Sequence, residues 1–189
     1  MSKTEENNMP GIPDQKWLEA LSKKCGFTHF AVLDVSTLEF MQDIRDMCNA
    51  DQCRNYNKSW SCPPACSSLE DMRETVKKYS YGLLVQTVGE LEDSYDWEGI
   101  MDTSARHKEN FALMRGELDK VLDAVLAMGA GTCRLCETCT YPDSPCRFPD
   151  KMEVSMEASG LFVSKVCTDN DLAYNYGADR IAFTSCFLY

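Results

Sequence analysis

The 189-residue sequence lacks most of the motifs that identify nucleotide-binding and hydrolytic enzymes. It has two histidines, His29 and His107, and neither lies in an H-x-x-x-H or nucleophile–base pattern. We expect His107 on a solvated helix face. No G-x-G-x-x-G, no P-loop and no internal repeat is present. Since no run of 18 apolar residues occurs, we expect no membrane-spanning segment.

Basic residues are also scarce. Nineteen lysines and arginines stand against 30 aspartates and glutamates, which gives a net charge of −11. A phosphate backbone requires a basic face, so nucleic acid is not expected as a partner. Five acidic residues crowd into residues 90–98: Glu90, Glu92, Asp93, Asp96 and Glu98. This segment is either a solvated loop or a docking surface for a basic partner.

The abundant residue is cysteine, of which there are eleven. The first residues are polar and carry no apolar core of a signal peptide, so we expect the protein in the cytoplasm. In that reducing compartment, clustered cysteines more often bind metals than form disulfides. Cys25, Cys167 and Cys186 stand alone in expected helices or strands, where a thiol behaves as a small buried hydrophobe.

The more specific cysteine set has the spacing C-x2-C-x2-C-x6-C and comprises Cys133, Cys136, Cys139 and Cys146. Three thiolates from one tight loop, with a fourth from further along, is a pattern of iron–sulfur ligation. Structural zinc is the alternative, although zinc sites usually pair two separated C-x2-C knuckles. Arg147 follows the last cysteine and is a candidate to offset cluster charge or bind an anion.

The second set lies upstream and comprises Cys48, Cys53, Cys62 and Cys66. Tyr56 and Trp60 lie between these cysteines and would give a cluster apolar cover, which tunes its potential. The role of Cys66 decides the chemistry. If Cys66 is a ligand, the site is closed and suited to electron transfer, whereas without it one iron stays open to a substrate.

The remaining patterns predict an α/β or α+β fold in which a small mixed sheet is flanked by helices and carries two cysteine-rich loops at one end. Residues 1–13 are expected to form a flexible tail, and residues 14–189 a single metal-binding domain. Helices are expected from Asp14 to Gly26, over 38–47, after a capping box at Ser67 and Glu70, and over 103–128, 155–160 and 169–176. Strands are expected over 28–35, 81–88, 161–163 and 180–189.

Three motifs together resemble a family of unknown function described as predicted metal-binding proteins. The first is Cys48…Cys53-x2-Tyr56-x3-Trp60-x-Cys62-Pro63-Pro64, and the second is Cys133-x2-Cys136-x2-Cys139…Pro145-Cys146-Arg147-x-Pro149. The third is Ser155-Met156-Glu157-Ala158-x-Gly160. The resemblance implies seven metal ligands, namely Cys48, Cys53, Cys62, Cys133, Cys136, Cys139 and Cys146. Cys66 is not clearly part of that pattern.

These observations favour a cytoplasmic iron–sulfur protein with two [4Fe–4S] clusters that passes electrons to a redox partner protein. One alternative is an enzyme that uses an open iron of the first cluster on a small thiolated or anionic substrate. Another is a zinc-stabilised interaction module that docks through residues 90–98.

Overall fold

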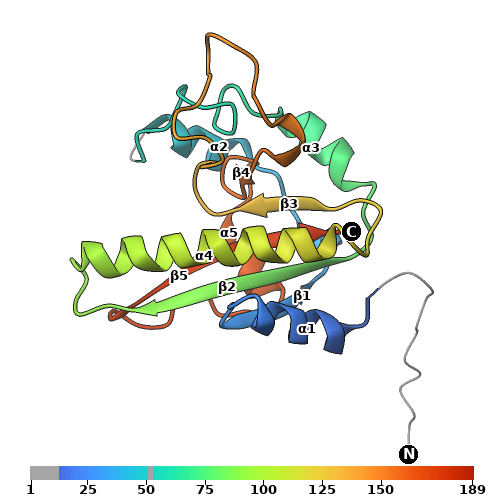
Figure 1. Ribbon diagram of the computed structural model, residues 1–189, viewed down its shortest axis with the longest axis vertical. Coiled ribbons are helices and arrows are strands. Elements are labelled where there is room, and N and C mark those ends of the chain that lie inside the picture. Colours follow the sequence, from blue (N-terminus) through green and yellow to red (C-terminus); the bar gives the residue numbers. More distant parts are fainter. Residues whose placement is uncertain (1–12, 51–52) are drawn as a thin grey trace, which may run out of the picture.

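The computed structural model describes residues 13–50 and 53–189, so almost all of the expected N-terminal tail lies outside the described residues. Its centre is one five-stranded sheet with the strand order β1-β2-β5-β3-β4 (Figure 1). The strands are β1 (His29–Leu33), β2 (Gly82–Glu90), β3 (Leu126–Gly129), β4 (Val154–Ser155) and β5 (Arg180–Leu188). All pairings are antiparallel except that between β3 and β4, so the sheet is mixed, as predicted.

Helices cover both faces of this sheet. They are α1 (Gln15–Lys24), α2 (Gln42–Met47), α3 (Leu69–Val76), α4 (Trp97–Leu118) and α5 (Val163–Asp169). Short 3-10 turns lie at Val35–Thr37, Cys48–Ala50 and Pro149–Lys151. In the part of the chain that the structure describes, no helix is both long and apolar enough to cross a membrane.

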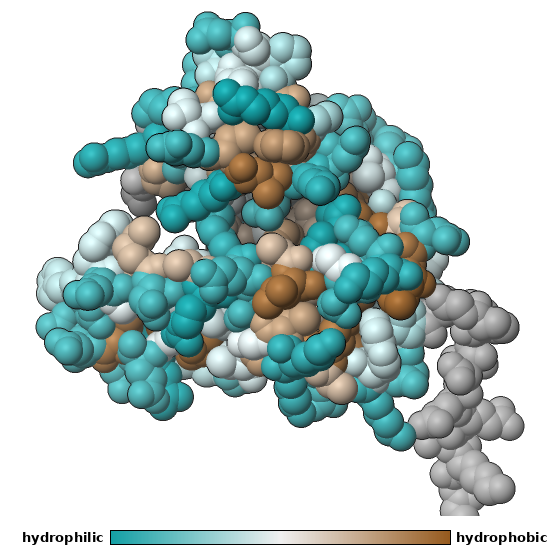
Figure 2. All heavy atoms as spheres, in the orientation of Figure 1, coloured by the Kyte–Doolittle hydropathy of each residue, from teal (hydrophilic) through white to brown (hydrophobic). Residues whose placement is uncertain are grey.

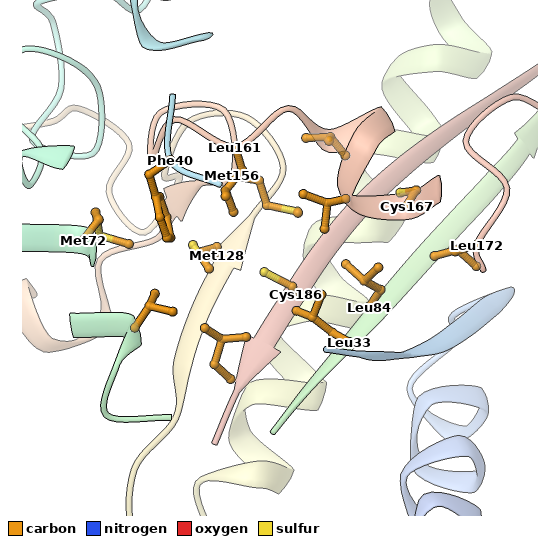
Figure 3. Close-up of a cluster of buried hydrophobic side chains, with 14 of the residues drawn as sticks. Leu33, Phe40, Met72, Leu84, Met128, Met156, Leu161, Cys167, Leu172 and Cys186 are labelled. Atoms are coloured by element: carbon orange, nitrogen blue, oxygen red, sulfur yellow. The ribbon is translucent and has the colours of Figure 1, made fainter. Parts of the chain in front are cut away.

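Two apolar layers hold the helices to the sheet, because alternate residues of a strand point to opposite faces. On one face, Leu83 and Val85 of β2 pack with Phe111 and Met114 of α4 and with Leu18 of α1. The opposite layer gathers side chains from β1, β2, β3, β5, α3, α5 and the 155–161 turn, among them Leu84, Met128, Met156, Cys167 and Cys186 (Figure 3). β2 and the second half of β5 are therefore buried on both faces.

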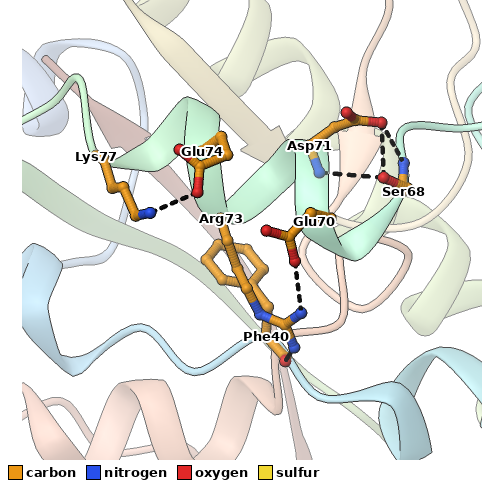
Figure 4. A network of polar contacts seen from close by, with 7 residues as sticks. All are labelled: Phe40, Ser68, Glu70, Asp71, Arg73, Glu74 and Lys77. Atoms are coloured by element: carbon orange, nitrogen blue, oxygen red, sulfur yellow. Dashed lines mark hydrogen bonds and ion pairs between the residues drawn. The ribbon is translucent and has the colours of Figure 1, made fainter.

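Several expected elements are present. Asp14 caps α1 and accepts a hydrogen bond from the Trp17 N–H at 2.7 Å. The capping box of α3 lies one residue later than predicted, at Ser68 and Asp71, whose hydroxyl and carboxylate each accept from the other's backbone N–H (Figure 4). Arg73 of the same helix donates to the carbonyl of Phe40 at 2.6 Å and so ties α3 to the segment before α2 (Figure 4).

The prediction of one helix over residues 103–128 is wrong at both ends. α4 begins at Trp97, because the Asp96 carboxylate caps it by accepting from the Gly99 N–H at 2.9 Å. It ends at Leu118, and Leu126 to Gly129 form β3. The apolar residues after Leu118 continue the helical stripe in sequence, but Leu126, Ala127 and Met128 pair with the end of β5.

His107 is likewise misplaced by the sequence prediction. It faces the sheet from the middle of α4 and is 1% exposed. Its Nδ1 lies 3.0 Å from Thr87 Oγ1 of β2, and its Nε2 lies 2.7 Å from Ser185 Oγ of β5. The two hydroxyls satisfy the ring, and this explains why a polar side chain tolerates that buried position.

The third region of disagreement is residues 155–176. Residues 155–160 form β4 and a turn rather than a helix, and Leu161 makes only an isolated bridge with Phe40. The helix expected over 169–176 lies earlier, as α5 from Val163 to Asp169. Val163, Val166 and Cys167 are buried and form the inward face of α5. In so short a stretch, the spacing of these three residues does not distinguish a helix from a strand followed by a turn.

Candidate metal centres

The two cysteine-rich loops meet at one end of the molecule, above the edge of the sheet formed by β3 and β4 (Figure 1). The Trp60 indole donates to the carbonyl of Ser144 at 3.1 Å and packs edge-on against Tyr141, with ring centroids 4.9 Å apart. The Tyr141 hydroxyl contacts Asn57 Oδ1 at 2.5 Å. Trp60, expected as a cover for the upstream site, therefore fastens one loop to the other.

The downstream set surrounds a cavity of about 520 Å³. Four cysteines line it: Cys133, Cys136, Cys139 and Cys146. Arg147 also lines this cavity and braces the loop by donating to the carbonyl of Thr138 at 2.8 Å. The structure thus brings together all four cysteines of the C-x2-C-x2-C-x6-C motif.

The Cys139 sulfur accepts hydrogen bonds from both cysteine-rich loops. Partial burial raises its pKa, but hydrogen bonds from the backbone N–H groups of Trp60, Tyr141 and Thr140 and from the Ser59 hydroxyl outweigh this effect. The pKa of Cys139 is consequently below that of an ordinary thiol. Backbone donors from both loops thus favour a thiolate, the form that binds metal.

The upstream set lines a larger cleft of about 760 Å³, but with only three of its four cysteines: Cys48, Cys53 and Cys62. Tyr56 lines the same cleft. Burial raises the pKa of Cys48 to about 11, and negative charge on Cys53 and Glu157 adds to the rise. Three neighbouring thiolates there would repel one another unless positive charge lay among them, so the donor set fits a bound metal group.

Cys66 does not line that cleft and is 5% exposed, although its sulfur lies within electrostatic reach of Cys48 and Cys62. Its Sγ lies 3.7 Å from the carbonyl of Ala158 and accepts from Arg45 Nη2 at 3.4 Å. Burial raises the pKa of this thiol. Cys66 therefore contacts protein atoms around the site, whereas Cys48, Cys53 and Cys62 line the cleft itself.

A compact hydrogen-bonded bridge connects the two sets. Thr132 Oγ1 lies 3.3 Å from Cys62 Sγ and 3.3 Å from Ser61 Oγ. Ser61 Oγ in turn accepts from the Cys133 N–H at 3.1 Å. One upstream cysteine and one downstream cysteine are thus linked through two hydroxyl groups.

Residues 31–189 match the profile of the family described as "Predicted metal-binding protein (DUF2284)". The chain belongs to this family. The matched range includes all eight cysteines of the two sets, and it confirms the resemblance inferred from the motifs. No curated protein and no solved structure matches the chain.

None of the eleven cysteines of this member of the predicted metal-binding family forms a disulfide, so each of them is a free thiol. Within residues 13–50 and 53–189, however, no three His, Cys, Asp or Glu side chains converge closely enough to hold a single metal ion. The cysteines surround cavities instead of meeting at a point. Cys25, Cys167 and Cys186 line neither cavity and are buried in the apolar layers, as expected of lone thiols.

Three charged residues that line the upstream cleft were not identified in the sequence analysis. Lys108 comes from α4, Glu157 from the turn after β4, and Arg180 from the start of β5. The Glu157 carboxylate is surrounded by protein atoms yet reachable from the cleft, and burial raises its pKa. The Ser-Met-Glu-Ala motif was the only sequence signal for any of the three.

Proposed function

We propose that the protein is an iron–sulfur protein with two [4Fe–4S] clusters, one for electron transfer and one that faces a substrate cleft. Cys133, Cys136, Cys139 and Cys146 would hold the first of these as a closed site. Cys48, Cys53 and Cys62 would hold the other, with one iron free of protein sulfur. The observation that supports this division best is that three upstream cysteines line the cleft, whereas Cys66 does not line it and contacts Arg45 and Ala158.

The arrangement of the thiols favours clusters over zinc. Zinc would need its ligands about 2.3 Å from one point. The described cysteines are instead spread around cavities of about 520 and 760 Å³. A cluster brings its own irons and sulfides, so its cysteine ligands stand further apart than those of a single ion.

The chain's own residues then have distinct tasks. When bound, the clusters supply one-electron redox chemistry, and an iron without a protein ligand supplies a Lewis-acid position. The N–H and O–H donors around Cys139 stabilise negative charge on its sulfur, which favours the reduced state of a cluster there. We expect electrons to come from a redox partner in the cytoplasm, with the acidic residues 90–98 as a docking surface for a basic face.

Anaerobic purification followed by metal analysis tests the proposal. We expect about eight iron atoms and about eight acid-labile sulfides per chain, with the EPR signals of two reduced clusters. Zinc without labile sulfide would contradict the proposal and support the zinc-stabilised module.

The open-iron assignment makes a paired prediction. Cys66→Ser is expected to leave iron content and both midpoint potentials unchanged, because the Cys66 sulfur contacts Arg45 and Ala158 rather than the cleft. Cys62→Ser is expected to remove or degrade the upstream cluster, since Cys62 lines the cleft. Iron analysis and potentiometric EPR on both variants decide the matter. A loss of iron in Cys66→Ser would restore the closed four-cysteine site.

A further inference from the structure

Two cations lie together in the cleft beside Cys62. Lys108 reaches it from α4 and Arg134 from the downstream cysteine loop. Burial, and also the positive charge of Arg134, lower the pKa of Lys108, so the two groups lie within electrostatic reach of each other. Lys108 Nζ donates to the Thr132 carbonyl at 2.5 Å. Across the described ranges, neither cation forms an ion pair.

The negative charges of Glu153 and of the Cys133 and Cys62 sulfurs also act on Lys108, but among the described residues none of them forms a salt bridge with it. A bound oxyanion in the cleft would pair with both cations directly. Arg134 makes no hydrogen bond to any residue that the structure describes, so its guanidinium donors remain available for a planar oxyanion. Among these negative charges, that of Glu153 has the largest effect on the pKa of Lys108.

The wall opposite the loops is the outer edge of β5. β2 pairs with β5 from Arg180 to Leu188, whereas β3 pairs only with Cys186, Phe187 and Leu188. Among the described residues, the first half of β5 therefore has no paired strand on that side, and residues 180–184 line the cleft in succession. Figure 2 shows the molecule hollowed between the cysteine-loop end and the body formed by α4 and the sheet.

Aromatic side chains line the same space. They are Tyr56, Trp97, Tyr174, Tyr176 and Phe183. A volume of about 760 Å³ is in the range of small-molecule sites. The cleft thus combines a cationic end beside Cys62 with flat apolar surfaces and unpaired backbone groups, which suits a ligand with a charged head and a planar body.

We propose that the cleft binds a small aromatic oxyanion, with its charged group between Lys108 and Arg134 and its ring against the aromatic residues and the free edge of β5. The inference rests on the proposed function only in assigning this ligand as the substrate beside the open iron. The rival role for the two cations is to offset the charge of a cluster.

Isothermal titration calorimetry with phenyl phosphate and inorganic phosphate tests the inference on anaerobically purified protein of measured metal content. We expect phenyl phosphate to bind more tightly than phosphate. Arg134→Gln and Lys108→Gln should each weaken phenyl phosphate by about tenfold or more, since each removes a charge-assisted contact. The matched control is Arg106→Gln, which removes a cation from the exposed side of α4, where Arg106 pairs with Asp102. It should leave binding unchanged.

The outcomes separate the inference from the proposed function. Absence of phenyl phosphate binding at about 10 mM, or equal losses in Arg106→Gln and Arg134→Gln, overturns the inference. A shifted cluster potential in Arg134→Gln without any anion binding overturns it too, in favour of charge compensation. A zinc-containing protein that still loses phenyl phosphate binding in Arg134→Gln supports the anion site while the iron–sulfur proposal fails.

Discussion

Replacement of both Cys136 and Cys139 by alanine is expected to remove about half of the iron and labile sulfide, from about eight to about four atoms of each per chain. The double variant leaves only Cys133 and Cys146 in the downstream cavity. Two thiolates do not retain a cluster that normally takes four. The pair also eliminates the sulfur that receives N–H groups from both loops. The upstream cluster should keep its EPR signal, because its three cysteines line a separate cavity.

A control must remove thiols without touching either cavity. Cys25→Ala suits this purpose, because Cys25 is buried in the apolar layer around α1. It should keep full iron content, although it will lower the free energy of unfolding slightly. If the double variant keeps all of its iron, the downstream loop holds no cluster. If it loses all of its iron, the two sets share one metal group.

The candidate ligands of the downstream site could be predicted from the sequence, because the spacing of ligands within one loop is a local property. Cys133, Cys136 and Cys139 are close in the chain and must be close in space. The opposite holds for the cleft. Its cationic pair joins Lys108 of α4 to Arg134 of a loop, and the juxtaposition depends on β3 lying between β4 and β5. Nothing in the local pattern reports that arrangement.

The errors in secondary structure have the same origin. Val121, Leu122 and Val125 continue the spacing of α4 in the sequence, but the chain turns after Leu118 and enters the sheet as β3. Pairing with β5, which comes some 60 residues later, prevails over the helical pattern. The burial of His107 cannot be derived from its own helix, because the partners that allow it, Thr87 and Ser185, lie on two distant strands.

His107 gives the protein a specific sensitivity to acid. Burial, together with the nearby positive charge of Lys108, lowers its pKa from 6.5 to about 3. The neutral ring donates from one nitrogen and accepts at the other, and so serves both Thr87 and Ser185. A protonated ring would have two donors and a buried charge with no carboxylate partner among the groups that hydrogen-bond to it.

The sign of the effect follows from the depressed pKa. Because the unfolded chain binds the proton near pH 6.5 and the folded one only near pH 3, the stabilisation is complete above pH 6.5 and is lost as the pH falls toward 3. The loss is about 1.4 kcal/mol per pH unit within that window, or about 2 kcal/mol between pH 7 and pH 5. Other groups titrate over this range, so only a difference between variants isolates the histidine.

Urea unfolding of the wild type and of His107→Gln at pH 7 and pH 5 supplies that difference. Glutamine carries one donor and one acceptor end and does not titrate, so the variant should lose about 2 kcal/mol less stability on acidification than the wild type does. His29→Gln is the control, because it removes the other histidine, which is exposed in the folded protein. Equal pH dependence in the wild type and in His107→Gln would mean that the pKa of His107 is the same in the folded and the unfolded chain, and the hydrogen bonds between α4, β2 and β5 would then need a different assignment.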